Sequence, residues 1–252
     1  MDTILIPIYI IIFIFGIVIG SFLNVCIYRI PKQEDIVKAR SHCMQCDHLL
    51  QWYELIPLFS YLFQGGKCRA CKCKLSVQYP LIEAANGVAY VLIFIINGMN
   101  VDSLLYCLLT SALIVLSVID WRTYEIPVGI NYFIFVLGVA RTVLHYKDWV
   151  NHVIGFFAVS AVLYLIIVVT KGRGIGGGDM KLMAVCGLFL GWKEIILAFL
   201  LGCIIGSVVH IIRMRVTKCD HVLALGPYLS VGVVLAMLWG NQWITWYFSQ
   251  YI

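Results

Sequence analysis

Charged residues are scarce in this sequence. Only 12% of its 252 residues are Asp, Glu, Lys or Arg, whereas 62% are hydrophobic. A soluble domain of this length has too little interior to hide so much apolar surface. The composition therefore excludes an ordinary soluble fold and predicts a protein that is surrounded largely by a lipid bilayer.

The alternation of polar and apolar residues that is typical of an outer-membrane barrel is also missing. The apolar residues instead form runs of about 15 to 25, the length that a helix needs to cross about 30 Å of hydrocarbon. We expect an all-α polytopic membrane protein, because only helices satisfy their own backbone groups within such runs. The eight predicted transmembrane helices are at about 4–27, 80–97, 104–119, 127–144, 150–170, 180–192, 195–212 and 222–247, and the short sixth is compatible with a re-entrant segment.

The first apolar run lacks the features of a cleaved secretory signal. No positive charge precedes it, since the chain begins Met1, Asp2 and Thr3, and no small-residue cleavage site follows. We expect this run to remain as a membrane anchor.

Basic residues are rare on one side of the predicted membrane. Only Arg141, Lys147 and Lys193 fall there when the eight spans alternate. The other side receives Arg29, Lys32, Lys38, Arg40, Lys67, Arg69, Lys72, Lys74, Arg122, Lys171, Arg173, Lys181, Arg213, Arg215 and Lys218. Positive charge marks the cytoplasmic side, so both termini are expected outside. The same asymmetry accounts for the net charge of +5. Because these basic residues lie at loop ends, we interpret them as topology signals and expect no nucleic-acid surface.

The longest polar segment, residues 29–79, contains two CxxC pairs. The pairs are Cys43 with Cys46 and Cys68 with Cys71, with 21 residues between them. Two such turns can bring four thiolates around one tetrahedral zinc, and a cytoplasmic location disfavours disulfides. Four protein ligands leave no position for water, so this zinc should be structural. Reduced thiols without a metal are the alternative, and Cys73 and His42 are either substitute ligands or neighbours that bind nothing.

Two acids stand at the ends of apolar spans. Asp120 closes the third and Asp179 opens the sixth, and the topology places both at the cytoplasmic boundary. An acid there is costly unless it is paired or hydrated, which makes it a functional candidate. Two neighbouring carboxylates can share a proton and activate water, as aspartyl peptidases require. The alternative is two unrelated acids that interact with Arg122 and Lys181.

Glycines precede the second acid. Gly176, Gly177 and Gly178 would let an extended substrate backbone pass close to Asp179. The stretch at residues 172–177 also matches the dinucleotide fingerprint GxGxxG, but that fingerprint requires a strand and a helix of a soluble βαβ unit. Because the stretch follows a membrane span, we exclude a dinucleotide site.

Motifs of other membrane proteases are absent. The sequence contains neither HExxH nor GxSxG, which excludes the usual zinc metalloprotease and serine hydrolase signatures. Ser207 with His210 could suggest a serine dyad, although small residues are common where membrane helices pack. Glu83, at the mouth of the second span, is a further acid that either positions substrate or is simply hydrated.

Six motifs in order resemble the bacterial type IV prepilin peptidase family, a group of GxGD-type intramembrane aspartyl proteases. They are GSFLNV with YRIP at 20–31, RSHC at 40–43, LIP with SYL at 55–62, YPLIE at 79–83, Asp120 with Ile126-Pro127, and GGGD with Lys181 at 176–181, followed by a late LGPY at 225–228. The sequence departs from the family pattern at Met44, Val128 and Tyr228, where proline, an acid and phenylalanine are usual.

The resemblance implies a division of the chain and a function. Residues 1–28 would be the first helix, 29–79 a cytoplasmic zinc-binding domain with four cysteine ligands, and 80–252 a multi-helix membrane peptidase domain. Asp120 and Asp179 would be catalytic and the four cysteines would bind zinc, with Gly176, Gly177, Gly178, Lys181 and Glu83 expected to contact substrate. The enzyme would cleave prepilin or pseudopilin precursors at the cytoplasmic membrane of a bacterium, and S-adenosylmethionine would serve N-methylation of the new amino terminus. A pilus, a type II secretion apparatus or a DNA-uptake machine would supply similar precursors.

Two other functions remain alternatives on the sequence alone. A proton-coupled transporter would also use intramembrane acids, but those acids should line a path across the bilayer, whereas Asp120 and Asp179 are expected at one face. A non-catalytic assembly factor with a zinc module would retain its function without either aspartate.

Overall fold

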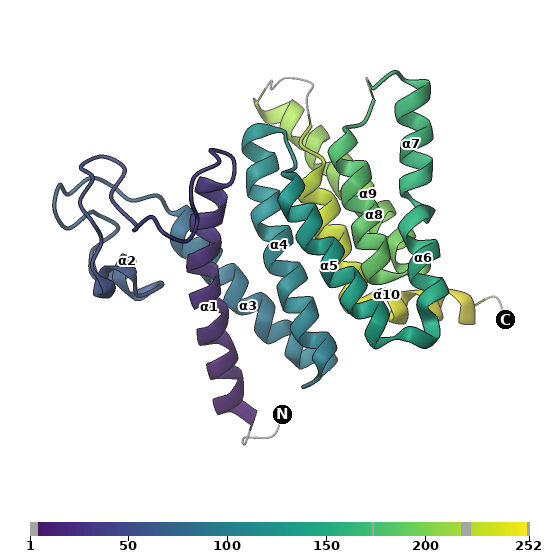
Figure 1. Cartoon of the computed structure of the whole chain (residues 1–252), viewed down its shortest axis with the longest axis horizontal. Helices are drawn as coiled ribbons and strands as arrows, with labels where there is room; N and C mark the ends of the chain where they lie inside the picture. The colour runs from purple at the N-terminus through teal and green to yellow at the C-terminus, as the bar shows by residue number, and fades with distance from the viewer. Residues whose placement is uncertain (1–4, 173, 218–222, 251–252) are drawn as a thin grey trace. The chain divides into compact units, whose positions relative to one another are not determined.

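The apolar runs of the sequence form α-helices in a computed structural model, which describes residues 5–172, 174–217 and 223–250 (Figure 1). Within these ranges the β pairing is limited to two isolated bridges, so the all-helical prediction is confirmed. Each predicted span coincides with helical structure. The predicted span boundaries at residues 4 and 222, together with Arg173 and Lys218, lie outside the described ranges.

The chain divides into two compact units, residues 1–103 and 104–252. The first contains α1 (Ile6–Arg29), the 3-10 turn η2 (Trp52–Leu55), α2 (Phe59–Phe63) and α3 (Gln78–Asn97). The second contains nearly all of α4 (Val101–Thr123), then α5 (Val128–Leu144), η3 (Tyr146–Asp148), α6 (Trp149–Ala158), α7 (Ser160–Val169), α8 (Gly177–Leu190), α9 (Trp192–Thr217) and α10 (Gly226–Ser249). The predicted functional boundaries at residues 28 and 79 stay predictions.

Helices α1 and α3 pack closely in the first unit because glycine occupies their contact. A Cβ atom built on Gly16 would lie only 2.6 Å from the Cα atom of Gly87. Beside this contact, the Asn86 side chain donates a 2.7 Å hydrogen bond to the Gly16 carbonyl. Small residues and side-chain amides of this kind hold membrane helices together where lipid supplies no hydrophobic driving force between them.

The segment between α1 and α3 is tied to both helices. The buried Arg29 side chain, at the end of α1, donates hydrogen bonds to the carbonyls of Asp35, Ala39 and Arg40, with the shortest at 2.8 Å to Ala39. The amide of Leu58 donates a 2.8 Å bond to the Glu83 carboxylate of α3. These contacts hold the beginning of the long irregular segment against α1 and its middle against α3.

Helix α8 is the buried element of the second unit. Every residue from Leu182 to Leu190 is buried, and the helix packs against α5, α6, α7 and α9 (Figure 1). Its approach to α6 is very close, since a Cβ atom on Gly187 would fall 2.1 Å from the carbonyl oxygen of Gly155. This helix of 14 residues is thus enclosed by four other helices of the second unit.

Basic side chains hold the C-terminal end of α8. Arg141 donates a 2.6 Å hydrogen bond to the Phe189 carbonyl and a second bond, of 2.7 Å, to the Tyr106 hydroxyl. The ring of His152 bonds the Leu188 carbonyl at 2.9 Å, so its Nδ1 carries the proton. Helix-terminal carbonyls lack partners within the helix, and cations are favoured there.

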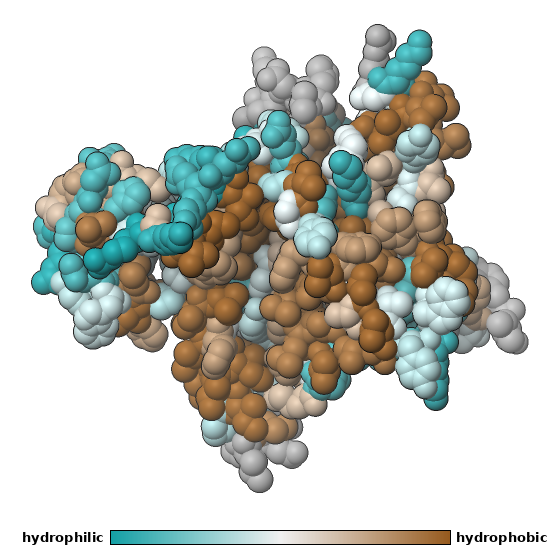
Figure 2. Space-filling view, viewed as in Figure 1, coloured by the Kyte–Doolittle hydropathy of each residue, from teal (hydrophilic) through white to brown (hydrophobic). Residues whose placement is uncertain are grey.

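Among the residues that the structure describes, five helical segments are long and apolar enough to cross a membrane: Ile6–Arg29, Gln78–Asn97, Val101–Thr123, Tyr146–Val169 and Trp192–Val216. Helix α5 is apolar but shorter. The exact number of eight spans therefore stays a prediction. On the face in Figure 2, hydrophobic residues cover most of the visible helix surface, and hydrophilic residues gather on the segment that connects α1 to α3 and at helix ends. Exposed apolar side chains on helices, such as Phe15 and Val169, are suited to contact with lipid.

We predict that Gly187→Ala lowers the thermal stability of the purified protein, because the added methyl group collides with the α6 backbone. Overpacking of this kind costs about 1–3 kcal/mol. Gly129→Ala in α5 is the matched control, since a Cβ atom there meets nothing within 4 Å. Equal melting temperatures of the two variants in detergent would contradict the close contact of α6 with α8.

Candidate active site and metal centre

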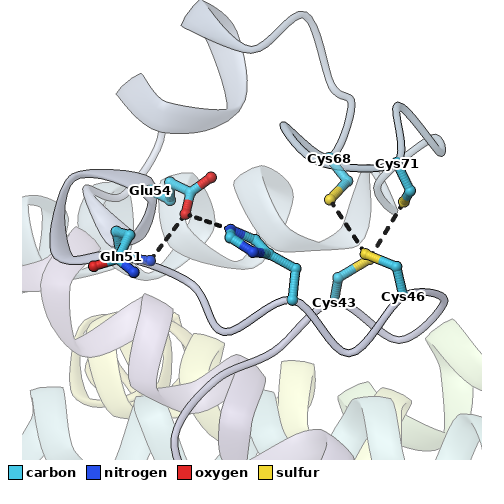
Figure 3. Close-up of polar contacts among 7 residues, drawn as sticks. Cys43, Cys46, Gln51, Glu54, Cys68 and Cys71 are labelled. Carbon is cyan, nitrogen blue, oxygen red and sulfur yellow. Dashed lines mark hydrogen bonds and ion pairs between the residues drawn. The ribbon is translucent and has the colours of Figure 1, made fainter.

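Four cysteine thiols of the 29–79 segment converge on one point. The sulfur atoms of Cys43, Cys46, Cys68 and Cys71 all lie within 4.8 Å of one another. The closest pairs across the two motifs are Cys43 with Cys71 at 3.9 Å and Cys46 with Cys68 at 4.0 Å. Figure 3 shows the thiols of one motif pointing toward those of the other. The structure thus brings together the four cysteines that the sequence predicts as metal ligands.

This arrangement fits a tetrahedral zinc ion. Zinc–sulfur bonds of about 2.3 Å place the ligand sulfurs of a tetrahedral site about 3.8 Å apart. The sulfur–sulfur distances of 3.9 and 4.0 Å are close to this value. Of the two predicted substitutes, His42 turns its ring toward the carbonyl of Arg40 at 3.4 Å, whereas Cys73 lies beside the thiols. An all-thiolate set suits a structural ion that holds two turns together.

A buried carboxylate fixes the chain beyond the first cysteine pair. The Gln51 amide donates a 2.9 Å hydrogen bond to Glu54, whose carboxylate also lies 3.3 Å from the His48 ring (Figure 3). The Gln51 N–H, followed by the His48 ring, holds the pKa of Glu54 below its ordinary value. Glu54 therefore stays ionised near neutral pH and links this segment to the cysteine turn.

Asp120 lies in the last turn of α4. The helix ends at Thr123, and the amide of Tyr124, which has a φ of +56°, bonds back to the Asp120 carbonyl. The Asp120 side chain is buried, at 5% exposure. Its Oδ2 accepts a 3.0 Å hydrogen bond from the amide of Gly226, at the start of α10. A backbone donor from a helix far along the chain thus orients this carboxylate.

Asp179 lies in the first turn of α8, three residues after the N-cap Gly176. The half-buried side chain of Asp179 folds back over Gly176, and the Gly176 amide donates a hydrogen bond to the Asp179 carboxylate. An acid at this position commonly bonds the N-cap amide, and the positive end of the helix favours its negative charge. A Cβ atom on Gly176 would lie 3.2 Å from Asp179 Oδ2, so glycine leaves room for this conformation.

The two aspartates come together at one end of the second unit. Ile126, in the segment after α4, packs on the first turn of α8, where a Cβ atom on Gly178 would lie 3.0 Å from the Ile126 Cβ. Asp120 and Asp179 are close enough for the charge of one carboxylate to act on the other. The two acids, from α4 and α8, therefore lie near one another at this end of the second unit, and their action as a catalytic pair stays a prediction.

Gly226 is a site residue that sequence reasoning missed, although its motif was noted. A Cβ atom at this position would lie 2.7 Å from Asp120 Oδ2, so the close approach of the α10 backbone depends on glycine. The available signal was Gly226-Pro227 at the start of an apolar run, because proline favours the first turn of a helix. Nothing in the sequence says that this helix begins beside Asp120.

The predicted substrate-contacting residues fall into two groups. Gly176 and Gly177 are exposed beside Asp179, and Lys181 is exposed one residue beyond Met180 on α8. Glu83 belongs to the first unit, where it is buried and accepts the hydrogen bond from the Leu58 amide. Contact of these residues with substrate stays a prediction.

The alternative serine dyad has no support in the side-chain geometry. The Ser207 hydroxyl donates a 2.7 Å hydrogen bond to the Cys203 carbonyl, one turn earlier in α9. This bond is ordinary for a helical serine and directs the hydroxyl to its own backbone. The aspartate pair is therefore the better candidate.

Comparisons with known proteins give matches along most of the chain. Residues 14–96 match the model of the bacterial peptidase A24 N-terminal domain, and residues 107–211 match that of the type IV leader peptidase family. The chain is 34% identical to a prepilin leader peptidase/N-methyltransferase of Bacillus subtilis (strain 168), over 95% of this chain and 98% of that protein. It is 31% identical to a protein of the same name from Pseudomonas putida, over 91% and 90% respectively.

No solved structure matches the chain significantly. The relatives and both family models nevertheless span most of the sequence, and the second model includes Asp120 and Asp179. The resemblance expected from the motifs is thus confirmed, and the chain belongs to the type IV leader peptidase family.

Proposed function

We propose that this protein is an intramembrane aspartyl endopeptidase that removes the leader peptide from type IV prepilin-like precursors. The observation that carries the proposal is the convergence of Asp120 and Asp179 at one end of the second unit. Family membership and the names of the relatives support the substrate class. They favour neither a transporter nor a non-catalytic assembly factor.

The chemistry follows from two carboxylates that share one proton. The ionised acid takes a proton from water as the water oxygen attacks the scissile carbonyl, and the protonated acid donates its proton to the carbonyl oxygen. Proton transfer to the amine then accompanies cleavage of the C–N bond. The Gly226 amide orients Asp120 throughout by its hydrogen bond to Oδ2.

The glycines before Asp179 form the proposed substrate path. A Cβ atom on Gly177 would meet nothing within 4 Å, so the space beside this backbone is open. An unwound precursor can lie along Gly176, Gly177 and Gly178 with its scissile bond at the carboxylates. We assign Lys181 and Glu83 to the same substrate-contacting set from the resemblance.

We propose that the active site faces the cytoplasm of a bacterial inner membrane. The five membrane-length apolar helices indicate a multi-pass membrane protein. The distribution of Lys and Arg supports cytoplasmic placement of residues 29–79 and both termini outside. A precursor with a basic leader in the cytoplasm and an apolar helix in lipid would then present its cleavage site at the level of Asp120 and Asp179.

We expect Asp120→Asn and Asp179→Asn each to reduce the rate of precursor cleavage by about 10⁴-fold or more, because neither acid can carry out the proton transfer of the other. The measurement is conversion of purified precursor in detergent or proteoliposomes. Glu125→Gln is the matched control, since this acid is exposed and lies only five residues beyond Asp120. Near-normal cleavage by either Asn variant would reject the pair as catalytic.

We expect Gly226→Ala to lower the rate of cleavage by about 10²-fold, because the added methyl group displaces the Asp120 carboxylate by a fraction of an ångström to an ångström. Gly240→Ala in the same helix is the control, as a Cβ atom there meets only ordinary contacts of 3.4 Å and more. If Gly226→Ala retained full activity, the backbone bond to Asp120 would not matter for catalysis.

We propose one structural zinc ion per chain, held by Cys43, Cys46, Cys68 and Cys71. The predicted consequence of Cys43→Ser combined with Cys68→Ser is loss of zinc from the purified protein and faster proteolysis of the 29–79 segment, because both buried ligands are removed. Full zinc content in this double variant, measured by atomic absorption, would reject the assignment.

We propose that the chain also transfers a methyl group from S-adenosylmethionine to the new amino terminus. The support is the family resemblance and the printed names of the relatives, which include N-methyltransferase. Mass spectrometry of a processed substrate should reveal one added methyl group. An unmodified amino terminus, formed with S-adenosylmethionine present, would restrict this protein to peptidase activity.

A further inference from the structure

The two cysteine turns have the same backbone structure, 25 residues apart. We call residues 41–50 the first knuckle and residues 66–75 the second. The matching backbone hydrogen bonds are Cys43 N to His48 O and Cys68 N to Cys73 O, Asp47 N to Cys43 O and Lys72 N to Cys68 O, and Leu50 N to Ser41 O and Leu75 N to Gly66 O. Equivalent residues can therefore be compared directly between the knuckles.

The knuckles differ at the residue five positions after their first cysteine. In the first knuckle this residue is His48, whose ring is 3.3 Å from the Glu54 carboxylate. In the second knuckle it is Cys73, whose sulfur lies 3.6 Å from the sulfur of Cys43. The second knuckle thus brings three thiols to the centre, and the first brings two.

Cys73 lies against this cluster, although its sulfur is not among the four that all lie within 4.8 Å of one another. Sulfurs bound to one tetrahedral zinc are about 3.8 Å apart. The 3.6 Å separation of Cys73 from Cys43 is within about 0.2 Å of this value, and the 3.9 Å separation of Cys71 from Cys43 is within about 0.1 Å of it. Cys73 also interacts with the thiol of Cys71. Four thiols consequently form the cluster, and a fifth lies beside it, next to Cys43 and Cys71.

We propose that Cys73 is a fifth metal-binding thiol that shares one coordination position with Cys71. This inference rests on the zinc centre proposed above. Cys43 is buried, and its sulfur lies at ligand distance from the sulfurs of both Cys71 and Cys73. Cys71 is exposed. Exchange replaces one zinc–sulfur bond by another: the incoming thiol releases its proton and the departing thiolate takes one up. No oxidation is involved, and the ion keeps four thiolates.

The test is metal binding by the full-length protein with single and double substitutions. Cys71→Ser and Cys73→Ser should each retain about one zinc per chain, and their cobalt-substituted forms should keep the thiolate charge-transfer intensity of four ligands. The double variant Cys71→Ser, Cys73→Ser should bind at least about tenfold more weakly, with the spectrum of three thiolates. Cys46→Ser is the control, because Cys46 is on the first knuckle, beside Cys68. This variant should bind the metal more weakly, since Cys73 is not expected to replace Cys46 as a ligand.

Each other outcome has a distinct meaning. If Cys71→Ser alone weakened binding as much as the double variant, Cys73 would be a bystander and the proposal would fail. If Cys73→Ser alone removed the metal, Cys73 would be an obligatory ligand and the sharing would be wrong. If the unmodified protein bound no zinc or cobalt, the zinc centre itself would be rejected, which separates that failure from failure of the Cys73 assignment.

Discussion

The hydrogen bond from the Gly226 amide to Asp120 is the contact on which the proposed chemistry depends. It joins the end of α4 to the start of α10, and Ile126 joins the segment after α4 to the start of α8. Three helix termini therefore meet where two acids are needed. Carboxylates in apolar surroundings are costly unless polar groups satisfy them, and helix N-termini supply N–H donors without adding another charge. The backbone thus supplies hydrogen bonds to the carboxylates through N–H donors that carry no net charge.

The other end of α8 explains how a 14-residue helix can hold Asp179 in place. Arg141 and His152 bond its last carbonyls, and Gly155 allows α6 to touch Gly187. The helix is therefore fixed by polar contacts at its C-terminal end and by close backbone packing along its length. These contacts anchor the helix whose first turn contains Asp179, and proton transfer requires that acid to be positioned accurately.

Sequence reasoning predicted the helices, the acids and the thiols because each leaves a local signal. Apolar runs indicate helices, an acid at the end of a run is conspicuous, and paired cysteines have a recognisable spacing. The role of Gly226 had no such signal, because it depends on a contact between residues far apart in the chain. Cys73 was a possible substitute ligand from its place beside the second cysteine pair, but its approach to Cys43 depends on a long-range contact of the same kind. The same limit applies to the break between α6 and α7 at Val159, which lies within a continuous apolar run.

The central claim is that Asp120 and Asp179 act as one pair with one shared proton. The most direct measurement is the pH dependence of kcat/KM for cleavage of a purified precursor, over a range in which the protein stays folded. A proton-sharing pair predicts a bell-shaped profile, because activity is lost both when the two acids are protonated and when both are ionised. A profile with a single limb, which would report only one essential ionisation, would contradict the pair.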